Sequence, residues 1–288
     1  MDKIAFFQKD FSKRALTWML IVFCAVFMGL KLKLDSITRK KIPGSSIIYI
    51  PSGKFLRYMT FGYSSLAADL IYLWAIQYYG SYEIADRFKY LDHIFSIIAE
   101  LDPRYVDPYE TGAMIAIYEA RDPQLAFRIL DRGLEKNPDQ WIFPFDAGHY
   151  AQIVAKDYET AEKYFKKAME IPGAPEHAKR LYANALYKQS DFKSAWETWL
   201  EVYNTAKDNR IRKIASNHLY QVKAAADTKA LTEAVGKFKE QYSRLPQNLE
   251  ELKRAGLIAA VPKDLDNKDY LYDSKTGEVK APTIPWKR

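Results

Sequence analysis

The residues of this sequence that could act as catalysts or metal ligands are dispersed. The four histidines are at least 28 residues apart, and none lies in a metalloprotease, nucleotide-binding or serine-hydrolase motif. The single cysteine, Cys24, cannot form a disulfide within the chain and provides no thiolate metal site. The sequence therefore predicts a protein that is not an enzyme and has no cofactor, metal site or small-molecule substrate. The histidines are His93, His149, His177 and His218.

Three aspartates near the C-terminus could suggest a calcium site. Asp264, Asp266 and Asp269 lie within six residues, but the segment lacks the glycine and the distal glutamate of an EF-hand loop. We interpret them as part of a structural loop.

The net charge of +7 is concentrated at the N-terminus. Residues 1–41 hold nine Lys or Arg against three Asp, whereas residues 42–288 hold 34 basic and 33 acidic residues. A nucleic-acid-binding protein carries its basic excess on the folded body, and here the excess flanks one apolar run. The distribution argues against nucleic-acid binding and favours a membrane surface.

Residues 15–30, ALTWMLIVFCAVFMGL, carry no charge. As a helix, residues 15–34 match the roughly 30 Å hydrocarbon core, with Lys31 and Lys33 reaching outward to the headgroups. No small-x-small cleavage site follows the run, so we favour an uncleaved transmembrane anchor with its tail, residues 1–34, over a cleaved signal peptide. A buried helix of a soluble protein is the remaining alternative.

The orientation of this anchor is weakly specified. Four basic residues precede the apolar run and five follow within twelve positions, so the positive-inside rule nearly cancels. A short N-terminal tail before a large body is typical of a signal anchor. We expect a single-pass protein of the bacterial inner membrane with a periplasmic body.

A linker is predicted over residues 35–63. Turn signals at Pro43 and Pro51 indicate loops, with a short strand at residues 47–50. The second half is apolar, which favours contact with the bilayer surface or with the end of the following domain. A helix over residues 66–80, apolar on nearly all sides, is expected to be buried at that end.

An internal repeat of about 34 residues occupies the middle of the chain. Alanine recurs with spacings of 35, 34 and 35, and a leucine stands one period earlier; a large apolar residue or alanine follows each four residues later. A period of this size marks a solenoid of stacked helix pairs. The positions are Leu91, Ala126, Ala161, Ala195 and Ala230; Phe95, Leu130, Phe165, Trp199 and Ala234; and Pro103, Pro138 and Pro172 after three of the units.

Helix-start signals recur at the expected boundaries. In the second helix of each unit, the recurring alanine should lie where two helices cross closely, with the large residue one turn further on the same face. The start signals are Asp107, Asp122, Asp157, Pro175, Asp191 and Asp227.

These alanines, large residues and prolines resemble the tetratricopeptide repeat (TPR) family, and residues 157–173, DYETAEKYFKKAMEIPG, are the best single match. The resemblance covers about residues 70–242. It implies an all-α, right-handed solenoid of about five helix pairs over residues 64–242, with an irregular last unit at residues 211–242. It also implies a groove, lined by the first helix of each pair, that binds a protein or peptide.

In this register the first helices expose seven candidate groove residues. Arg180 and Asn184 lie one turn apart on one face, a spacing that some family members use to clamp a peptide carboxylate. An ordinary solvated surface is the alternative interpretation of each position. The candidates are Thr111, Tyr118, Asp146, Tyr150, Arg180, Asn184 and Tyr187, with Ile115 and Phe143 in the same register.

The period stops after Tyr242, which predicts a separate module at residues 243–288. A short helix is expected in residues 244–258, with Pro246 in its first turn and Gly256 near its end.

A hairpin should follow, with residues 270–272 and 278–279 paired across a turn in which Gly277 is left-handed. This module resembles the C-terminal segment of major pseudopilins, although Asp-Leu-Asp-Asn at residues 264–267 stands in place of the usual Asp-Pro-Trp-Gly stretch.

Three hypotheses of function follow. The first is a non-enzymatic, membrane-anchored scaffold that binds a protein partner in envelope secretion, pilus or exported-complex assembly. The second is a cytoplasm-facing adaptor or co-chaperone for a transporter. The third is an envelope enzyme, which would need Asp146, His149 and Arg180 to converge in one dry pocket.

Overall fold

The computed structural model describes residues 2–35, 50–84 and 86–287. This part of the chain is mostly helical, with twelve α-helices and one two-stranded sheet. Helix α1 (Asp2–Asp35) is a unit apart from helices α2–α12. Most of the strand predicted at residues 47–50 lies outside the described residues.

Helix α1 is long and apolar enough to cross a membrane. The 18 residues Leu16–Lys33 meet that criterion, and their first charged residue is Lys31. The side chains from Leu16 to Lys33 are exposed within the chain, Trp18 by 67%. A helix of this kind can span the hydrocarbon core.

Helix α2 (Gly53–Met59) forms inside the predicted linker, where the sequence indicated loops and a short strand. It packs against α4 (Leu91–Leu101), as does α3 (Ser64–Tyr79). The carboxylate of Glu100, on α4, accepts a hydrogen bond from the Lys54 backbone N–H at 2.8 Å. A cap from a distant helix satisfies the first turn of α2, and no local sequence signal reveals it. The 3₁₀-helix η1 (Arg87–Tyr90) leads into α4.

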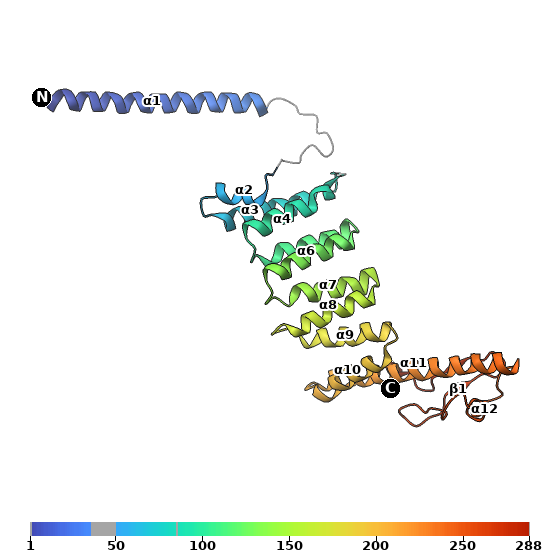
Figure 1. Cartoon of the computed structure of the whole chain (residues 1–288). Helices are drawn as coiled ribbons and strands as arrows, with labels where there is room; N and C mark the ends of the chain where they lie inside the picture. The colour runs from blue at the N-terminus through green and yellow to red at the C-terminus, as the bar shows by residue number, and fades with distance from the viewer. Residues whose placement is uncertain (1, 36–49, 85, 288) are drawn as a thin grey trace. The chain divides into compact units, whose positions relative to one another are not determined.

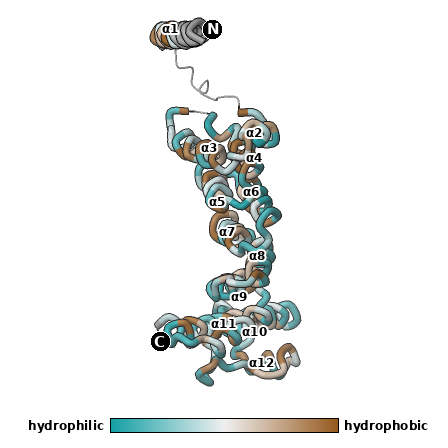
Figure 2. Tube along the Cα trace, turned by 90° about the vertical axis from the view of Figure 1, so that its left-hand side faces the viewer, coloured by the Kyte–Doolittle hydropathy of each residue, from teal (hydrophilic) through white to brown (hydrophobic). Residues whose placement is uncertain are grey.

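The next helices pack in chain order, each against its neighbours (Figure 1). Apolar and polar segments alternate along them (Figure 2), as expected of helices that bury one face. They are α5 (Val106–Met114) with its π-helical last turn η2 (Ile115–Glu119), α6 (Pro123–Lys136), α7 (Ile142–Tyr150) with its π-helical turn η3 (Ala151–Ala155), α8 (Tyr158–Glu170), α9 (Glu176–Lys188) and α10 (Phe192–Thr205).

The same turn joins three of these helix pairs. A residue with positive φ (Arg121, Lys156 or Ser190) precedes an aspartate in each case. The Asp122 and Asp157 carboxylates accept the backbone N–H groups of the third residue on, at 2.9 and 3.0 Å, and Asp191 does the same at 3.1 Å. These N-caps confirm three predicted helix starts. Asp107, in contrast, lies inside the first turn of α5 rather than at its N-cap, and Pro175 is the N-cap of α9 as predicted.

The recurring alanines confirm the predicted packing with one exception. Ala126, Ala161 and Ala195 are fully buried. Ala230 is exposed, so the prediction is wrong there, because α11 runs through this position as one continuous helix and no separate second helix of the pair forms. The large residues of the pattern, together with Leu91 and Ala234, are all buried.

Helix α11 (Asn209–Tyr242) is one continuous helix of 34 residues where a fifth helix pair was predicted. Asp227, expected to start a second helix, lies in its middle. The Asp227 carboxylate pairs with Lys223 at 2.7 Å and accepts the Tyr270 hydroxyl at 2.8 Å, so it is not used as a cap. The preceding Ala224–Ala226 favour unbroken helix.

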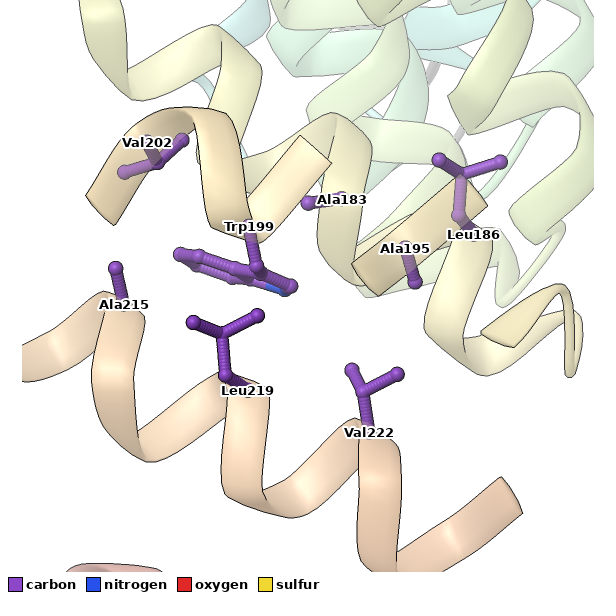
Figure 3. Packing of buried hydrophobic residues seen from close by; sticks show 8 residues of the cluster. All are labelled: Ala183, Leu186, Ala195, Trp199, Val202, Ala215, Leu219 and Val222. Carbon is purple, nitrogen blue, oxygen red and sulfur yellow. The ribbon is translucent and has the colours of Figure 1, made fainter. Parts of the chain in front are cut away.

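The core between α9, α10 and α11 is built around Trp199. Figure 3 shows its indole lying between α10 and the side chains of Ala215 and Leu219 on α11. Trp199 is 2% exposed. Trp199 occupies the position of the repeat that Phe95 and Phe165 occupy in other units, and here it packs α11 against α10.

The C-terminal module packs on α11. Helix α12 (Leu249–Arg254) begins after Asn248, whose side chain accepts the Glu251 N–H at 3.2 Å. Pro246 therefore lies before the helix and not in its first turn; its carbonyl accepts the Tyr272 hydroxyl. Gly256 follows the helix with φ of 70°, as predicted.

A hairpin completes the module. Strands β1 (Leu271–Tyr272) and β2 (Val279–Lys280) pair antiparallel, and Gly277 has φ of 77° in the turn between them, so the predicted hairpin is confirmed. A last 3₁₀-helix, η4 (Pro285–Lys287), contacts α11.

Candidate functional site

The predicted groove residues lie on α5 with η2, on α7 and on α9. Two clusters of polar side chains occupy these helices. The acid–tyrosine cluster consists of Glu110, Tyr118, Asp146 and Tyr150. The histidine–arginine cluster consists of His149, His177, Arg180 and His218, of which the last is on α11.

Two carboxyl groups of the acid–tyrosine cluster influence each other's pKa. Glu110 and Asp146 stand one repeat apart, on α5 and α7. Burial raises the pKa of Asp146 to about 7, and the neighbouring charge of Glu110 raises it further. Burial also raises the pKa of Glu110. The hydrogen bond between the two carboxyl groups raises the pKa of Asp146 and lowers that of Glu110, so Asp146 is the one of the two that keeps its proton to higher pH.

Two tyrosines flank this pair. Tyr150 is 8% exposed and Tyr118 is 52% exposed, and their rings meet edge to face with centroids 5.8 Å apart. Burial raises the pKa of Tyr150, and the Asp146 charge adds to the effect. Tyr118 is therefore a large aromatic side chain that stays accessible next to a pair of half-buried acids, a combination suited to protein recognition.

Thr111 is engaged within the chain. Its hydroxyl hydrogen-bonds to the Tyr72 hydroxyl of α3 at 2.7 Å, and Tyr72 meets Tyr105 edge to face. Thr111 thus fastens α5 to α3.

The histidine–arginine cluster gathers side chains from three helices. Burial lowers the pKa of His177, and the charge of Arg180 and then His149 lowers it further. His218 stacks on Trp199 with centroids 4.0 Å apart. Burial lowers the pKa of His218, and Arg180 contributes in the same direction. Arg180 carries a positive charge here at neutral pH.

The remaining predicted residues lie on α9. Arg180 and Asn184 are half-buried, one turn apart, and the buried Nε of Arg180 has no hydrogen-bond partner within the described residues. Tyr187 packs on Phe192 and belongs to the core around Trp199.

The three residues that an envelope enzyme would need are divided between the two clusters: Asp146 belongs to one, and His149 and Arg180 belong to the other. The partner of Asp146 is Glu110, whereas His149 and Arg180 both act on His177. His149 and Arg180 thus each influence His177, and Asp146 is grouped with another acid.

Sequence reasoning missed Glu110, His177 and His218. Glu110 stands 36 residues before Asp146, so its place in the repeat is the signal that could have found it. No local signal points to His218, because Trp286 reaches it from the C-terminal segment, with ring centroids 5.0 Å apart.

An open cavity of about 380 Å³ was also missed. It lies where α10 meets α11, outside the predicted groove residues, and two of its lining side chains, Arg212 and Lys213, are cationic. Arg212 donates to the Ala206 carbonyl at 2.8 Å, which occupies part of its donor capacity.

The predicted structural loop at the C-terminal aspartates is stabilised by hydrogen bonds to Asp264. The Asp264 carboxylate accepts the backbone N–H groups of Asp266 and Lys268 at 2.9 and 2.8 Å and the Thr283 hydroxyl. Among the residues that the structure describes, no group of three histidine, cysteine or acidic side chains is arranged to hold a metal ion.

Comparison with protein-family models and with curated protein sequences gives no significant match.

Proposed function

We propose that this chain is a membrane-anchored TPR-type scaffold that binds a protein partner and catalyses no reaction. The observation that carries the proposal is the recurrence, with spacings of 35 and 34 residues, of a left-handed residue followed by an aspartate N-cap at Asp122, Asp157 and Asp191. Ala126, Ala161 and Ala195 recur in the same register, fully buried. Repeats that bury themselves only against neighbours leave their first helices available to a partner.

The two clusters define the chemistry of that partner. A polypeptide lying along α5, α7 and α9 would meet the negative charge of Glu110 and Asp146 beside the accessible Tyr118. Further along it would meet the positive charge of Arg180. The fitting partner segment carries a basic residue at one end and an acidic group or a carboxyl terminus at the other, since such an arrangement fixes its direction.

The anchor places this scaffold beside a bilayer. In the proposal, α1 is an uncleaved span of a bacterial inner membrane and the body is periplasmic, as the short N-terminal tail favours. The pseudopilin-like C-terminal segment supports a role in assembling an envelope machine. A fusion after Arg288 tests the orientation: active alkaline phosphatase supports a periplasmic body, and a bright fluorescent protein supports the cytoplasmic adaptor.

Site-specific photocrosslinking tests the binding face. A photoreactive amino acid replaces Tyr118 in the full chain in native membranes, and the matched control replaces Arg128, an exposed residue of α6. We expect a discrete adduct from position 118 that diminishes when Glu110 and Asp146 are both changed to lysine. Equal labelling from both positions, or no adduct from position 118, would count against the scaffold.

A further inference from the structure

A group of large apolar side chains is exposed where the helical domain begins. We call it the N-terminal apolar face. Each member is at least 44% exposed, although α2 and α3 both pack on α4 with their opposite sides. The members are Phe55, Tyr58, Met59, Phe61, Tyr63, Leu66, Leu70, Leu73 and Ile76.

The spacing of these residues makes two helical stripes. Leu66, Leu70 and Leu73 recur at intervals of four and three along α3, so they share one side of the helix. Phe55, Tyr58 and Met59 repeat the pattern on α2. The expected burial of α3 at the end of the domain is therefore only half correct: Ala68 and Ala75 are buried and the leucines are not.

The turn between the two helices presents aromatic side chains outward. Phe61 is 90% exposed and has φ of 47°, a left-handed conformation that a bulky residue rarely adopts. Gly62 follows with φ of 97°, and Tyr63 N–H closes the turn on the Thr60 carbonyl at 2.9 Å. An exposed phenylalanine in a left-handed conformation does not stabilise the fold in water. An exposed apolar patch of this kind marks a surface that contacts a protein, a ligand or a membrane.

The chain itself indicates what that contact is. Only 21 residues separate Lys33, where the apolar stretch of α1 ends, from Phe55. Even fully extended they reach about 70 Å, so a bilayer that holds α1 is always within range of the face.

The charge of the connecting sequence points to the same surface. Residues 31–57 hold seven Lys or Arg and one acidic residue. Basic residues beside exposed tyrosine, phenylalanine and leucine are the composition of segments that lie in the headgroup region of anionic membranes.

We infer that α2, the turn at residues 60–63 and α3 dock into the headgroup region of the bilayer that α1 spans. Phe61 and the leucine stripe enter the boundary of the acyl chains. The inference rests on the proposed membrane span and adds a second attachment of the body. Two attachments restrict the rotation of the repeats and hold their first helices at a fixed height above the lipid.

Depth-dependent quenching tests the inference on the full chain, reconstituted in vesicles of phosphatidylethanolamine and phosphatidylglycerol. An environment-sensitive fluorophore is attached through Phe61→Cys in a Cys24→Ser background. The matched control is Lys237→Cys, on an exposed position of α11. A third sample labels the native Cys24, which reports on α1. Quenchers are lipids with a spin label on the acyl chain.

We expect quenching at position 61 and at Cys24 and none at position 237. Quenching at Cys24 without quenching at position 61 would overturn the docking and leave the anchor intact. Loss of quenching at both would remove the anchor and the inference together. A label at position 61 that is unquenched by lipid but transfers energy between copies would show that a second copy covers the face, which also overturns the inference.

A charge variant separates docking from mere proximity. Leu70→Glu, added to the Phe61→Cys chain, should abolish most of the quenching at position 61, because a carboxylate is repelled from anionic lipid and resists burial. Leu200→Glu, at a partly exposed leucine of α10, should leave it unchanged. Unaltered quenching in Leu70→Glu would contradict the role of the leucine stripe.

Discussion

The two ends of the helical domain differ in whether the apolar side of the terminal helix is covered. At the C-terminal end, Leu231, Val235 and Phe238 of α11 are covered by α12 and the hairpin, which supply Leu252 and Val279. At the N-terminal end, α3 keeps its leucine stripe exposed and the turn at residues 60–63 displays aromatic side chains.

Stacked repeats always leave an apolar surface on the terminal unit, and a cap is the usual solution. Within the described residues, the segment after α11 covers one end of the domain, whereas the leucine stripe of α3 at the other end stays exposed. The difference teaches that the exposed apolar face of α2 and α3 is informative, because the described residues cover the other end of the domain and we propose the bilayer as the cover of this one.

A pair of leucine substitutions gives the largest expected contrast. Leu252→Ala empties a fully buried position of the C-terminal cap and should lower the free energy of unfolding by about 2–5 kcal/mol. Leu70→Ala, at a side chain 60% exposed, should change it by less than about 0.5 kcal/mol. Thermal unfolding of both chains in detergent, followed by circular dichroism, measures the contrast; equal losses would show that the N-terminal apolar face is packed within the chain.

Between the ends, the acid–tyrosine cluster should make the repeats less stable as pH rises. Because the folded pKa of Asp146 is about 7 and the unfolded value is 3.8, the folded chain binds the extra proton between these values, and stability falls through that window. Asp146→Asn should therefore stabilise the chain by about 1–3 kcal/mol at pH 8, with no gain below pH 4.

Unfolding of the Asp146→Asn chain at both pH values checks this expectation. Glu159→Gln, which removes an exposed carboxylate paired with Lys163, is the control and should shift stability by less than about 0.5 kcal/mol. A gain that is independent of pH would mean that Asp146 is ionised in the folded chain.

Helix caps should show a smaller contrast between the ends. Asn248→Ala removes the side-chain cap of α12 and should cost about 1 kcal/mol. Ser52→Ala, at the N-cap of α2, removes no side-chain hydrogen bond, because Glu100 serves that helix, and should be nearly neutral. Hydrogen exchange of the first amides of α12 and α2 reports each effect locally. Faster exchange at the start of α2 in Ser52→Ala would show that Ser52 caps this helix and would contradict the role given to Glu100.

The smallest effect is a pH dependence of the opposite sign at the C-terminal end. The pKa of His218 is lowered from 6.5 by burial, so its contribution to stability is complete above pH 6.5 and is lost as pH falls through 6.5 towards the folded value. His218→Phe keeps a ring against Trp199 and should flatten this acid limb. Fluorescence of Trp286 and Trp199 across the titration follows it; an unchanged acid limb in His218→Phe would place the sensitivity elsewhere.

Local patterns in the sequence predicted much of this fold. An Asp before a helical stretch competes well for the first free N–H groups wherever it occurs, so Asp122, Asp157 and Asp191 mark helix starts without tertiary help. A small residue at a fixed period indicates where helices cross, and Ala126 and Ala161 are indeed buried.

The same rules failed where a distant group decided the outcome. Asp227 resembles a helix start, yet Lys223 and Tyr270 satisfy its carboxylate and α11 continues through it. The start of α2 is capped by Glu100, a residue 46 positions away from Lys54. The raised pKa of Asp146 depends on its burial and on the nearby Glu110, which the spacing of residues in the sequence does not report.

The sequence by itself determined an apolar N-terminal helix, a repeat of helices with its buried alanines, and a C-terminal hairpin, because each follows from short-range periodicity, capping and turn chemistry. The tertiary structure alone decided that the last unit is one unbroken helix, that two acids meet on neighbouring helices, and that one end of the domain is covered while the other keeps its leucines exposed. These outcomes depend on which surfaces of the chain pack together. Burial, charge pairing and capping by a distant residue exist only once those surfaces are in contact, so short-range sequence patterns do not predict them.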